Sequence, residues 1–336
     1  MCNVDSANML VRKDRLGGDC DPAQQAAEAY YECLVVLFAS ARRWHAEARL
    51  VLFTPAEVPT WFRRTAQCLN LELVAQPFRH IPPDANSGRR FVSSLYTLDA
   101  IDWIAARGDE AEVFILLDAD TVVLGPLEAT RWIERLGYLG WALKAGYNFN
   151  GLPLAKYREL VSKSGLPEPT EPEVVGGEFL AGSTTVFQLL ARETARVEQL
   201  NLNNGLDGKL ALTTEEQVLS LAVPYLARDN SLNIANRIWT APHHRTVDGT
   251  QRKLLIWHLP SEKGRGFRKL ARAAIDSRSW FWKVPRAQFL DEIGKLMGVT
   301  RRTPYRMAQD WVWNARGRRF KKGALASERV LYGPPW

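Results

Sequence analysis

The sequence has few cysteines, no long apolar run and no repeats, and each absence narrows the class of protein. Its cysteines form no Cys-x-x-Cys pair and have no regular spacing; they are Cys2, Cys20, Cys33 and Cys68. Neither disulfides nor a structural zinc site is indicated, and this favours a reducing compartment. Residues 1–18 lack the apolar core of a signal peptide, and the longest apolar runs are far shorter than the roughly 20 residues that span a bilayer. We therefore expect a soluble, cytoplasmic protein.

Positive charge is concentrated near the C-terminus. The net charge is +7, and residues 297–336 alone supply nine basic against two acidic side chains, so the remainder is neutral. The same segment contains aromatic residues, among them Tyr305, Trp311, Trp313 and Trp336. Aromatic side chains beside cations suit an anionic lipid surface, which predicts peripheral contact with the inner face of a membrane. Nucleic acid is a competing partner that we do not expect, and a helix that packs its tryptophans on the domain is the third interpretation.

Helical and strand patterns alternate along most of the chain. Asp21-Pro22 offers an N-cap and a first-turn proline, so the apolar stretch 30–41 is predicted to be helical. The later patterns predict strands at 49–53, 71–75, 113–117, 138–143 and 254–257, and helices at 59–69, 91–105, 126–136 and 151–164. A weaker pattern suggests a first strand at 9–11. This alternation predicts an α/β fold with a Rossmann-like, mostly parallel sheet flanked by helices. We expect one domain over residues 1–269 and a helical, basic and aromatic C-terminal extension over 270–336.

Two carboxylates follow the most apolar of these strands. Asp118-Ala119-Asp120 comes directly after Val113–Leu117, and ligands of α/β sheets bind outside the carboxyl ends of strands. A divalent ion carrying a diphosphate would offset the charge of two carboxylates at that edge. His258, at the end of a late strand, is a candidate nitrogen ligand, although the pair His243-His244 competes for the role. Two aspartates that only cap a turn are the simpler interpretation.

Further charged residues suit a diphosphate-sugar site. Arg89 and Lys263 are candidates to hold diphosphate oxygens, and Ala119 lies between the two aspartates. A carboxylate beside an oxocarbenium-like centre would stabilise it, and the candidates are Glu216, Glu215 and Glu178. Arg89 in a solvated loop, and Glu215-Glu216 as carboxylates favoured at a helix N-terminus, are the simpler interpretations. The glycine pair 176–177 before Glu178 marks either a close backbone approach to a ligand or a β-bulge.

These residues, in this order, resemble the nucleotide-sugar glycosyltransferases of the GT-A fold, most of all the retaining family 8 enzymes. The resemblance spans roughly residues 26–269. It rests on Asp118-Ala119-Asp120-Thr121 preceded by Arg89 and Tyr96, and on three later segments: Phe179-Leu180-Ala181-Gly182, Glu215-Glu216-Gln217-Val218-Leu219, and His258 with Lys263. It implies a hexosyltransferase that uses Mn²⁺ or Mg²⁺ and a UDP-sugar, retains anomeric configuration, and acts on a glycan, lipid-linked or other hydroxyl acceptor. Leu180 stands where the family has asparagine, and Glu216 where it has glutamine.

Two other functions fit parts of the pattern. A haloacid-dehalogenase-type phosphohydrolase would use Asp118 as its nucleophile. However, its Asp-x-Asp strand normally opens the domain, whereas here alternating elements precede Asp118. A non-catalytic relative that binds nucleotide sugars is the alternative that is not an enzyme.

Overall fold

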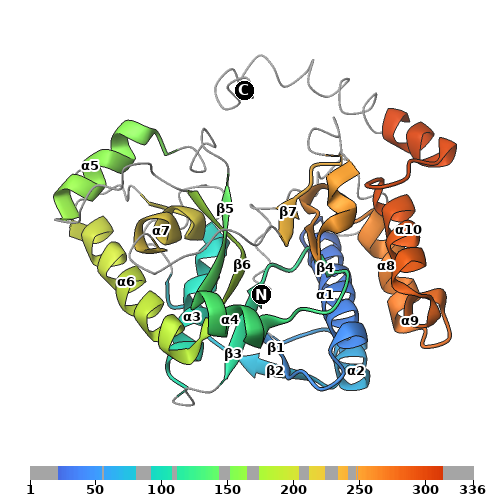
Figure 1. The fold of residues 1–336 in the computed structure, drawn as a ribbon, viewed down its shortest axis with the longest axis horizontal. Helices are drawn as coiled ribbons and strands as arrows, with labels where there is room; N and C mark the ends of the chain where they lie inside the picture. Colours follow the sequence, from blue (N-terminus) through green and yellow to red (C-terminus); the bar gives the residue numbers. More distant parts are fainter. Residues whose placement is uncertain are drawn as a thin grey trace.

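The computed structural model describes residues 22–54, 57–80, 92–107, 112–143, 152–164, 174–203, 212–223, 234–240, 247 and 249–312. These residues form a mixed α/β structure, as expected. The strands are β1 Leu50–Thr54, β2 Leu71–Ala75, β3 Val113–Leu117, β4 Thr121–Val123, β5 Tyr138–Leu143, β6 Val174–Ser183, β7 Ala235–Arg237 and β8 Ile256–His258. Figure 1 shows the strands lying between two groups of helices, with α5 and α6 on one side and α1, α8, α9 and α10 on the other.

The helices largely follow the predicted pattern. They are α1 Pro22–Trp44, α2 Thr60–Cys68, α3 Tyr96–Ala105, α4 Ala129–Leu136, α5 Leu154–Ser164, α6 Thr184–Asn203, α7 Glu215–Ala222, α8 Gly266–Ile275, α9 Trp280–Lys283 and α10 Arg286–Met297. Short 3-10 helices lie at η3 Val92–Leu95, η6 Gly249–Lys253 and η7 Pro260–Glu262. The predicted helices over 30–41 and 59–69 are confirmed, and those over 91–105, 126–136 and 151–164 are confirmed for most of their length as α3, α4 and α5. The proposed first strand at 9–11 lies outside the described residues.

The prediction of a mostly parallel sheet is wrong for the part of the chain that the structure describes. The strands form three small sheets, ordered β1-β2, β3-β6-β5 and β4-β8-β7. The pairs β1/β2 and β7/β8 are parallel, whereas β3/β6, β5/β6 and β4/β8 are antiparallel. The physical reason is β6, a ten-residue strand in the glycine-containing segment, which inserts in the reverse direction between β3 and β5. The register of β5 against β6 shifts between Gly140 and Trp141, opposite Leu180 and Gly176, so the pairing is irregular at the glycine pair, as a β-bulge there would make it.

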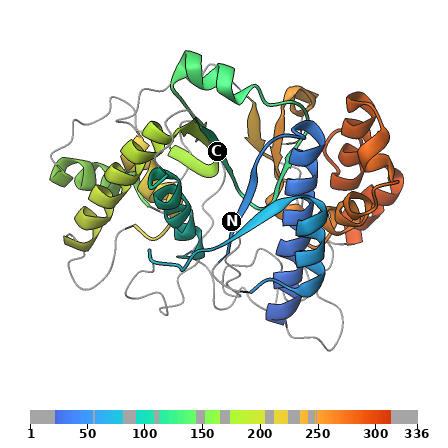
Figure 2. The ribbon, with the colours of Figure 1, turned by 90° about the horizontal axis from the view of Figure 1, so that it is seen from below.

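The helices after residue 265 belong to the same hydrophobic core as α1. Phe267 and Leu270 of α8, Phe281 of α9 and Phe289 of α10 are fully buried together with α1 side chains. Figure 2 shows these helices beside α1 and α2. The predicted domain boundary at 269/270 falls inside α8. The predicted helical character after that boundary is seen as far as residue 312, and residues 313–336 lie outside the described part.

A second core cluster lies between α3, α5, α6, α7 and the sheet of β3, β5 and β6. Its fully buried side chains include Leu98 of α3, Leu180 of β6, Phe187 of α6 and Leu219 of α7. This cluster supports β3 from one side, and the α1 cluster supports β4 from the other. The short connection between β3 and β4, residues 118–120, therefore lies where the two cores meet. Among the described residues, no helix is both long and apolar enough to cross a membrane.

Candidate metal centre

The connection from β3 to β4 holds both aspartates in place through main-chain contacts. The Asp118 N–H donates to the Glu178 carbonyl at 3.1 Å, which continues the pairing of β3 with β6. The Thr121 hydroxyl donates to the Asp118 carbonyl at 2.7 Å, and the Ala119 N–H donates to Asp118 Oδ1 at 2.7 Å. The two carboxylates differ in exposure, since the Asp118 side chain is 39% exposed and that of Asp120 is fully buried. One carboxylate therefore faces an opening and the other faces the interior.

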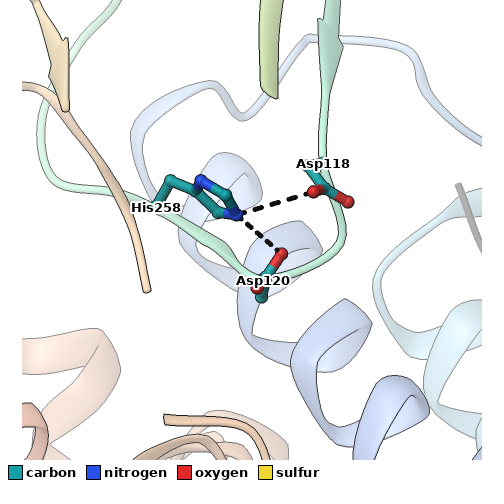
Figure 3. A group of neighbouring side chains, drawn as sticks. All are labelled: Asp118, Asp120 and His258. Carbon is teal, nitrogen blue, oxygen red and sulfur yellow. Dashed lines mark hydrogen bonds and ion pairs between the residues drawn. The ribbon is translucent and has the colours of Figure 1, made fainter. Parts of the chain in front are cut away.

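His258 completes a group of three donors. Antiparallel pairing of β4 with β8 places Thr121 opposite His258, and the Leu259 N–H donates to the Asp120 carbonyl at 2.9 Å. His258 Nε2 consequently lies 3.1 Å from Asp120 Oδ1 and 3.5 Å from Asp118 Oδ2 (Figure 3). One ligand atom from each residue lies within 4.8 Å of the other two. Adjacent ligands of a six-coordinate ion with bonds of about 2.1–2.2 Å are separated by about 3 Å, so this arrangement fits a divalent cation.

Lys263 lies at the same carboxylate. Its Nζ is 2.6 Å from Asp120 Oδ2 and 4.8 Å from the centre of the Tyr30 ring. Burial alone raises the pKa of Asp120, but Lys263 and His258 outweigh burial and hold that pKa well below its usual value. Desolvation opposes the charge of Lys263, yet Asp120 raises the lysine pKa well above its ordinary value. Asp120 is therefore an anion with one oxygen toward Lys263 and the other toward His258.

A second carboxylate lies behind His258. Glu178 Oε1 is 3.3 Å from His258 Nδ1, on the side of the imidazole away from the two aspartates. A carboxylate near this nitrogen is a common outer partner of a metal-binding histidine. His258 Nδ1 makes no hydrogen bond among the described residues, so Glu178 acts on the imidazole through its charge. The chemistry of the donors and this outer carboxylate together fit a metal ion at Asp118, Asp120 and His258.

Arg237 joins two of the glutamates that the sequence singled out. Its Nη2 donates to Glu178 Oε1 and lies 3.0 Å from Glu216 Oε2, and all three side chains are at most 11% exposed. The parallel pairing of β7 with β8 places Arg237 opposite His258. This part of the site holds four carboxylates, those of Asp118, Asp120, Glu178 and Glu216, against two cationic side chains, Lys263 and Arg237. A divalent cation would offset the excess of carboxylates.

Glu215 has a different environment from the other two glutamates. It opens α7, where Thr214 is the N-cap and accepts a hydrogen bond from the Gln217 N–H. Its side chain passes so close to Gly177 that a Cβ there would lie 2.6 Å from Glu215 Cγ. Burial is the main reason that the pKa of Glu215 rises to about 7, and the charge of Asp118 adds to the effect. The close backbone approach expected at the glycine pair is thus an approach to Glu215.

The structure brings together most of the predicted site residues. Asp118, Asp120, His258 and Lys263 meet at the ends of β3, β4 and β8. Glu178 and Glu216 lie behind His258, and Glu215 is near enough to Asp118 for that charge to raise its pKa. Ala119 is buried between the aspartates. Arg89 and the pair His243-His244 lie outside the described residues.

Two residues near the centre were not predicted from the sequence. Arg237 lies in a three-residue strand that is too short to show a periodic pattern. What indicates Arg237 is its place at the end of β7, since β7 pairs with the strand that carries His258. Tyr30 was counted only as an apolar position of a helix, although its ring lies against the Lys263 ammonium.

Neither the protein-family models nor the curated proteins that were compared with this chain give a match. Fold and site define a mixed α/β protein with a candidate centre of two carboxylates and one imidazole for a divalent metal.

Proposed function

We propose that this protein is a divalent-metal-dependent glycosyltransferase of the GT-A type, which transfers a hexose from a nucleoside diphosphate sugar, most simply a UDP-sugar, to a hydroxyl acceptor. The observation that carries the proposal is the convergence of Asp118, Asp120 and His258 on one position, with Lys263 beside it. Donor-sugar transfer requires a diphosphate to leave, and this arrangement provides hard oxygen ligands, one nitrogen ligand and a cation for that group.

The metal is Mn²⁺ in this proposal, with Mg²⁺ as the substitute, because a mixed oxygen and imidazole donor set suits Mn²⁺ better. When bound, the ion supplies the Lewis acidity that neutralises a leaving diphosphate. Asp118 is the more exposed ligand, so its side is the side from which a nucleotide would reach the centre. Asp120 and His258 are buried and fix the inner side.

Lys263 is proposed to contact diphosphate oxygens from its position beside Asp120. An ammonium carries three N–H donors, and its pairing with Asp120 Oδ2 occupies one direction only. The Tyr30 ring restricts the ammonium on another side. Arg89 is proposed to act on the same diphosphate, as the resemblance implies, from a segment outside the described residues.

Among the three glutamates, we assign the role beside the sugar to Glu215. Glu178 and Glu216 are both held by Arg237, and Glu178 also orients His258, so their charges serve the inner framework of the centre. Glu215 has a pKa near 7, and the charge of Asp118 helps to raise it. A metal ion at Asp118 would favour the ionised form of Glu215, because it offsets that charge.

The acceptor is proposed to be a glycan or a lipid-linked hydroxyl at the inner face of a membrane. The helical segment 304–312 exposes an apolar group of side chains, namely Tyr305, Met307, Trp311 and Val312. Arg301 and Arg302 flank this group, so a cationic and aromatic surface faces outward. Such a surface suits anionic lipid headgroups.

Turnover of the donor tests the proposal. Purified protein with UDP-hexoses should release UDP in Mn²⁺, slowly with water as the acceptor, and the release should stop on addition of a chelator. Asp118→Asn, Asp120→Asn should lower the rate at least a hundredfold, while Asp291→Asn, which breaks a surface ion pair with Arg252, should not change it. Hydrolysis of simple phosphate monoesters with no turnover of UDP-sugars would favour the phosphohydrolase, and metal-dependent binding without turnover would favour the non-catalytic relative.

A further inference from the structure

A buried network of ion pairs joins the helical segment 304–312 to the segment that carries Lys263. Arg306 is only 4% exposed and donates to both oxygens of Glu262, at 3.0 Å from Nη1 and 2.5 Å from Nη2. Its Nε donates to Asp310 Oδ1 at 3.1 Å, and its Nη1 also donates to the Leu296 carbonyl at 2.6 Å. Arg265 Nη2 donates to the same Asp310 oxygen at 2.6 Å. Four of the five guanidinium N–H groups therefore have acceptors, which lie on η7, on α10 and on the helical segment 304–312 itself.

This network changes the interpretation of the C-terminal charge. Arg306 is one of the nine basic residues counted in segment 297–336, but it forms buried ion pairs with Glu262 and Asp310. Burying ions costs several kcal/mol each, and apolar side chains would often stabilise the same space as well or better. A bidentate Arg–carboxylate pair does provide a fixed geometry. The network is thus better suited to placing Glu262 than to adding stability.

Glu262 directly precedes the lysine of the metal centre. It ends η7 and is fully buried, and Lys263 follows it with its ammonium at Asp120. Main-chain hydrogen bonds hold the residues before and after Glu262. The Leu259 N–H donates to the Asp120 carbonyl, and the Arg265 N–H donates to the Glu262 carbonyl. Thr240 also donates its hydroxyl to Glu262 Oε1. A Cβ at Gly266 would lie 2.8 Å from Glu262 Oε2, so the glycine at this position leaves the space that the carboxylate occupies.

We infer that Arg306 is a positioning residue for the metal centre: through Glu262 it fixes the segment 259–265 and so holds Lys263 against Asp120. The helical segment 304–312 is then part of the site framework and not a separable tail. The inference rests on the proposed function only for what Lys263 contacts in a nucleotide. The placement of the segment itself is a property of the protein without any ligand.

Hydrogen exchange of backbone amides, followed by mass spectrometry on the full chain, tests this inference without nucleotide or metal. Arg306→Met should speed exchange of the hydrogen-bonded amides of residues 259–265 at least tenfold; these belong to Leu259, which bonds to Asp120, and to Glu262 and Arg265. The amides of β1, which lies in the same core cluster as α8, should keep their wild-type rate. Arg306→Lys keeps the charge but cannot form the bidentate pair, so its exchange rate should lie between those of the wild type and Arg306→Met.

Two further variants keep the test decisive. Arg302→Met is the matched control, because Arg302 reaches Asp310 at 3.4 Å from a partly exposed position and does not touch Glu262. It should exchange like the wild type. Glu262→Gln, Arg306→Met removes both charges, so it avoids an unpaired buried carboxylate if the single variant does not fold. The inference predicts fast local exchange in the double variant as well. Wild-type exchange at 259–265, or acceleration by the same factor in β1, would overturn it, whatever the outcome of the UDP-sugar assay.

Discussion

Glu178 illustrates how one residue can affect the proposed metal centre without being a ligand. It lies 3.3 Å from the imidazole nitrogen that faces away from the aspartates, and Arg237 holds it from the other side. A carboxylate in this position orients the imidazole and makes it a better donor. The contribution is electrostatic, so removing the charge while keeping the shape isolates it.

Glu178→Gln should therefore weaken Mn²⁺ binding about tenfold, the lower end of what outer partners of metal ligands contribute. Calorimetric or EPR titration of Mn²⁺ measures this directly. Glu159→Gln is the control, since Glu159 pairs with Lys156 and Lys163 on the surface. Equal Mn²⁺ affinity in Glu178→Gln and the wild type would contradict the assigned role of the carboxylate.

Only part of the site was visible in the residues themselves. The aspartate pair after an apolar strand was readable because strand ends collect ligands. The ion pair that joins Arg237 to Glu178 and Glu216 connects residues far apart in the chain, and no local pattern encodes it. Likewise, the burial of Arg306 depends on Glu262 and Asp310, whereas its position in a basic stretch suggested an exposed charge.

Among the elements, the two helices α3 and α6 are joined by a histidine. His80 Nε2 lies 3.0 Å from Asp102 of α3, and Nδ1 lies 2.8 Å from Glu198 of α6. Burial opposes the charge of His80, but hydrogen bonds to Asp102 and Glu198 outweigh it and raise its pKa to about 10. The protonated ring therefore links α3 to α6 across the neutral pH range.

This shift makes the stability dependent on pH. A raised pKa contributes stability that is fully present below the unfolded value of about 6.5 and is lost as the pH rises toward 10. His80→Gln should therefore be less stable than the wild type by about 1 kcal/mol at pH 6, a figure reduced for the partial exposure of the pair. The difference should shrink by pH 10, as followed by urea unfolding at both values. A difference that is constant with pH would contradict the assigned charge.

The elements divide clearly into those that sequence patterns could predict and those that they could not. Helix α1 was readable because Pro22 and apolar residues at helical spacing both indicate it. Strands β4 and β7 have three residues each, too few to show a period, whereas β8 overlaps the strand predicted at 254–257. The direction of β6 depends on its partners β3 and β5. Pairing between distant segments cannot be predicted from the alternation of apolar and polar residues within one segment. The parallel sheet was therefore the wrong inference from a correct alternation of elements.

At the scale of the whole molecule, two hydrophobic clusters meet at the connection that bears the aspartates. Helices α8 to α10 are part of the first cluster, and the buried network of Arg306 attaches residues 304–312 to them. The outward side of this last segment remains exposed, with Trp311 at 71% and Tyr305 at 67%. The proposed membrane contact thus belongs to one side of a segment whose other side is built into the protein.

Point substitutions test that contact better than truncation, because deleting the chain from Arg301 would also remove Arg306 and Asp310. Tyr305→Ser, Trp311→Ser should lower pelleting with vesicles that contain anionic lipid several-fold, since both exposed rings are lost. Thermal unfolding should stay within a few degrees of the wild type. Trp61→Ser, at a partly exposed tryptophan of α2, is the control and should pellet normally. Undiminished pelleting of the double variant would exclude this surface.

The central claim is that Asp118, Asp120 and His258 bind a metal ion that in turn holds a diphosphate sugar. The most direct measurement is a thermal-shift panel of nucleotide sugars, with and without Mn²⁺, on the wild type and on Asp118→Ala, Asp120→Ala. If these three residues bind the metal, at least one UDP-hexose should raise the melting temperature of the wild type by several degrees only when Mn²⁺ is present. The variant should show no such rise. If no nucleotide sugar stabilises the wild type more than the folded variant, the proposed metal and diphosphate-sugar site is contradicted.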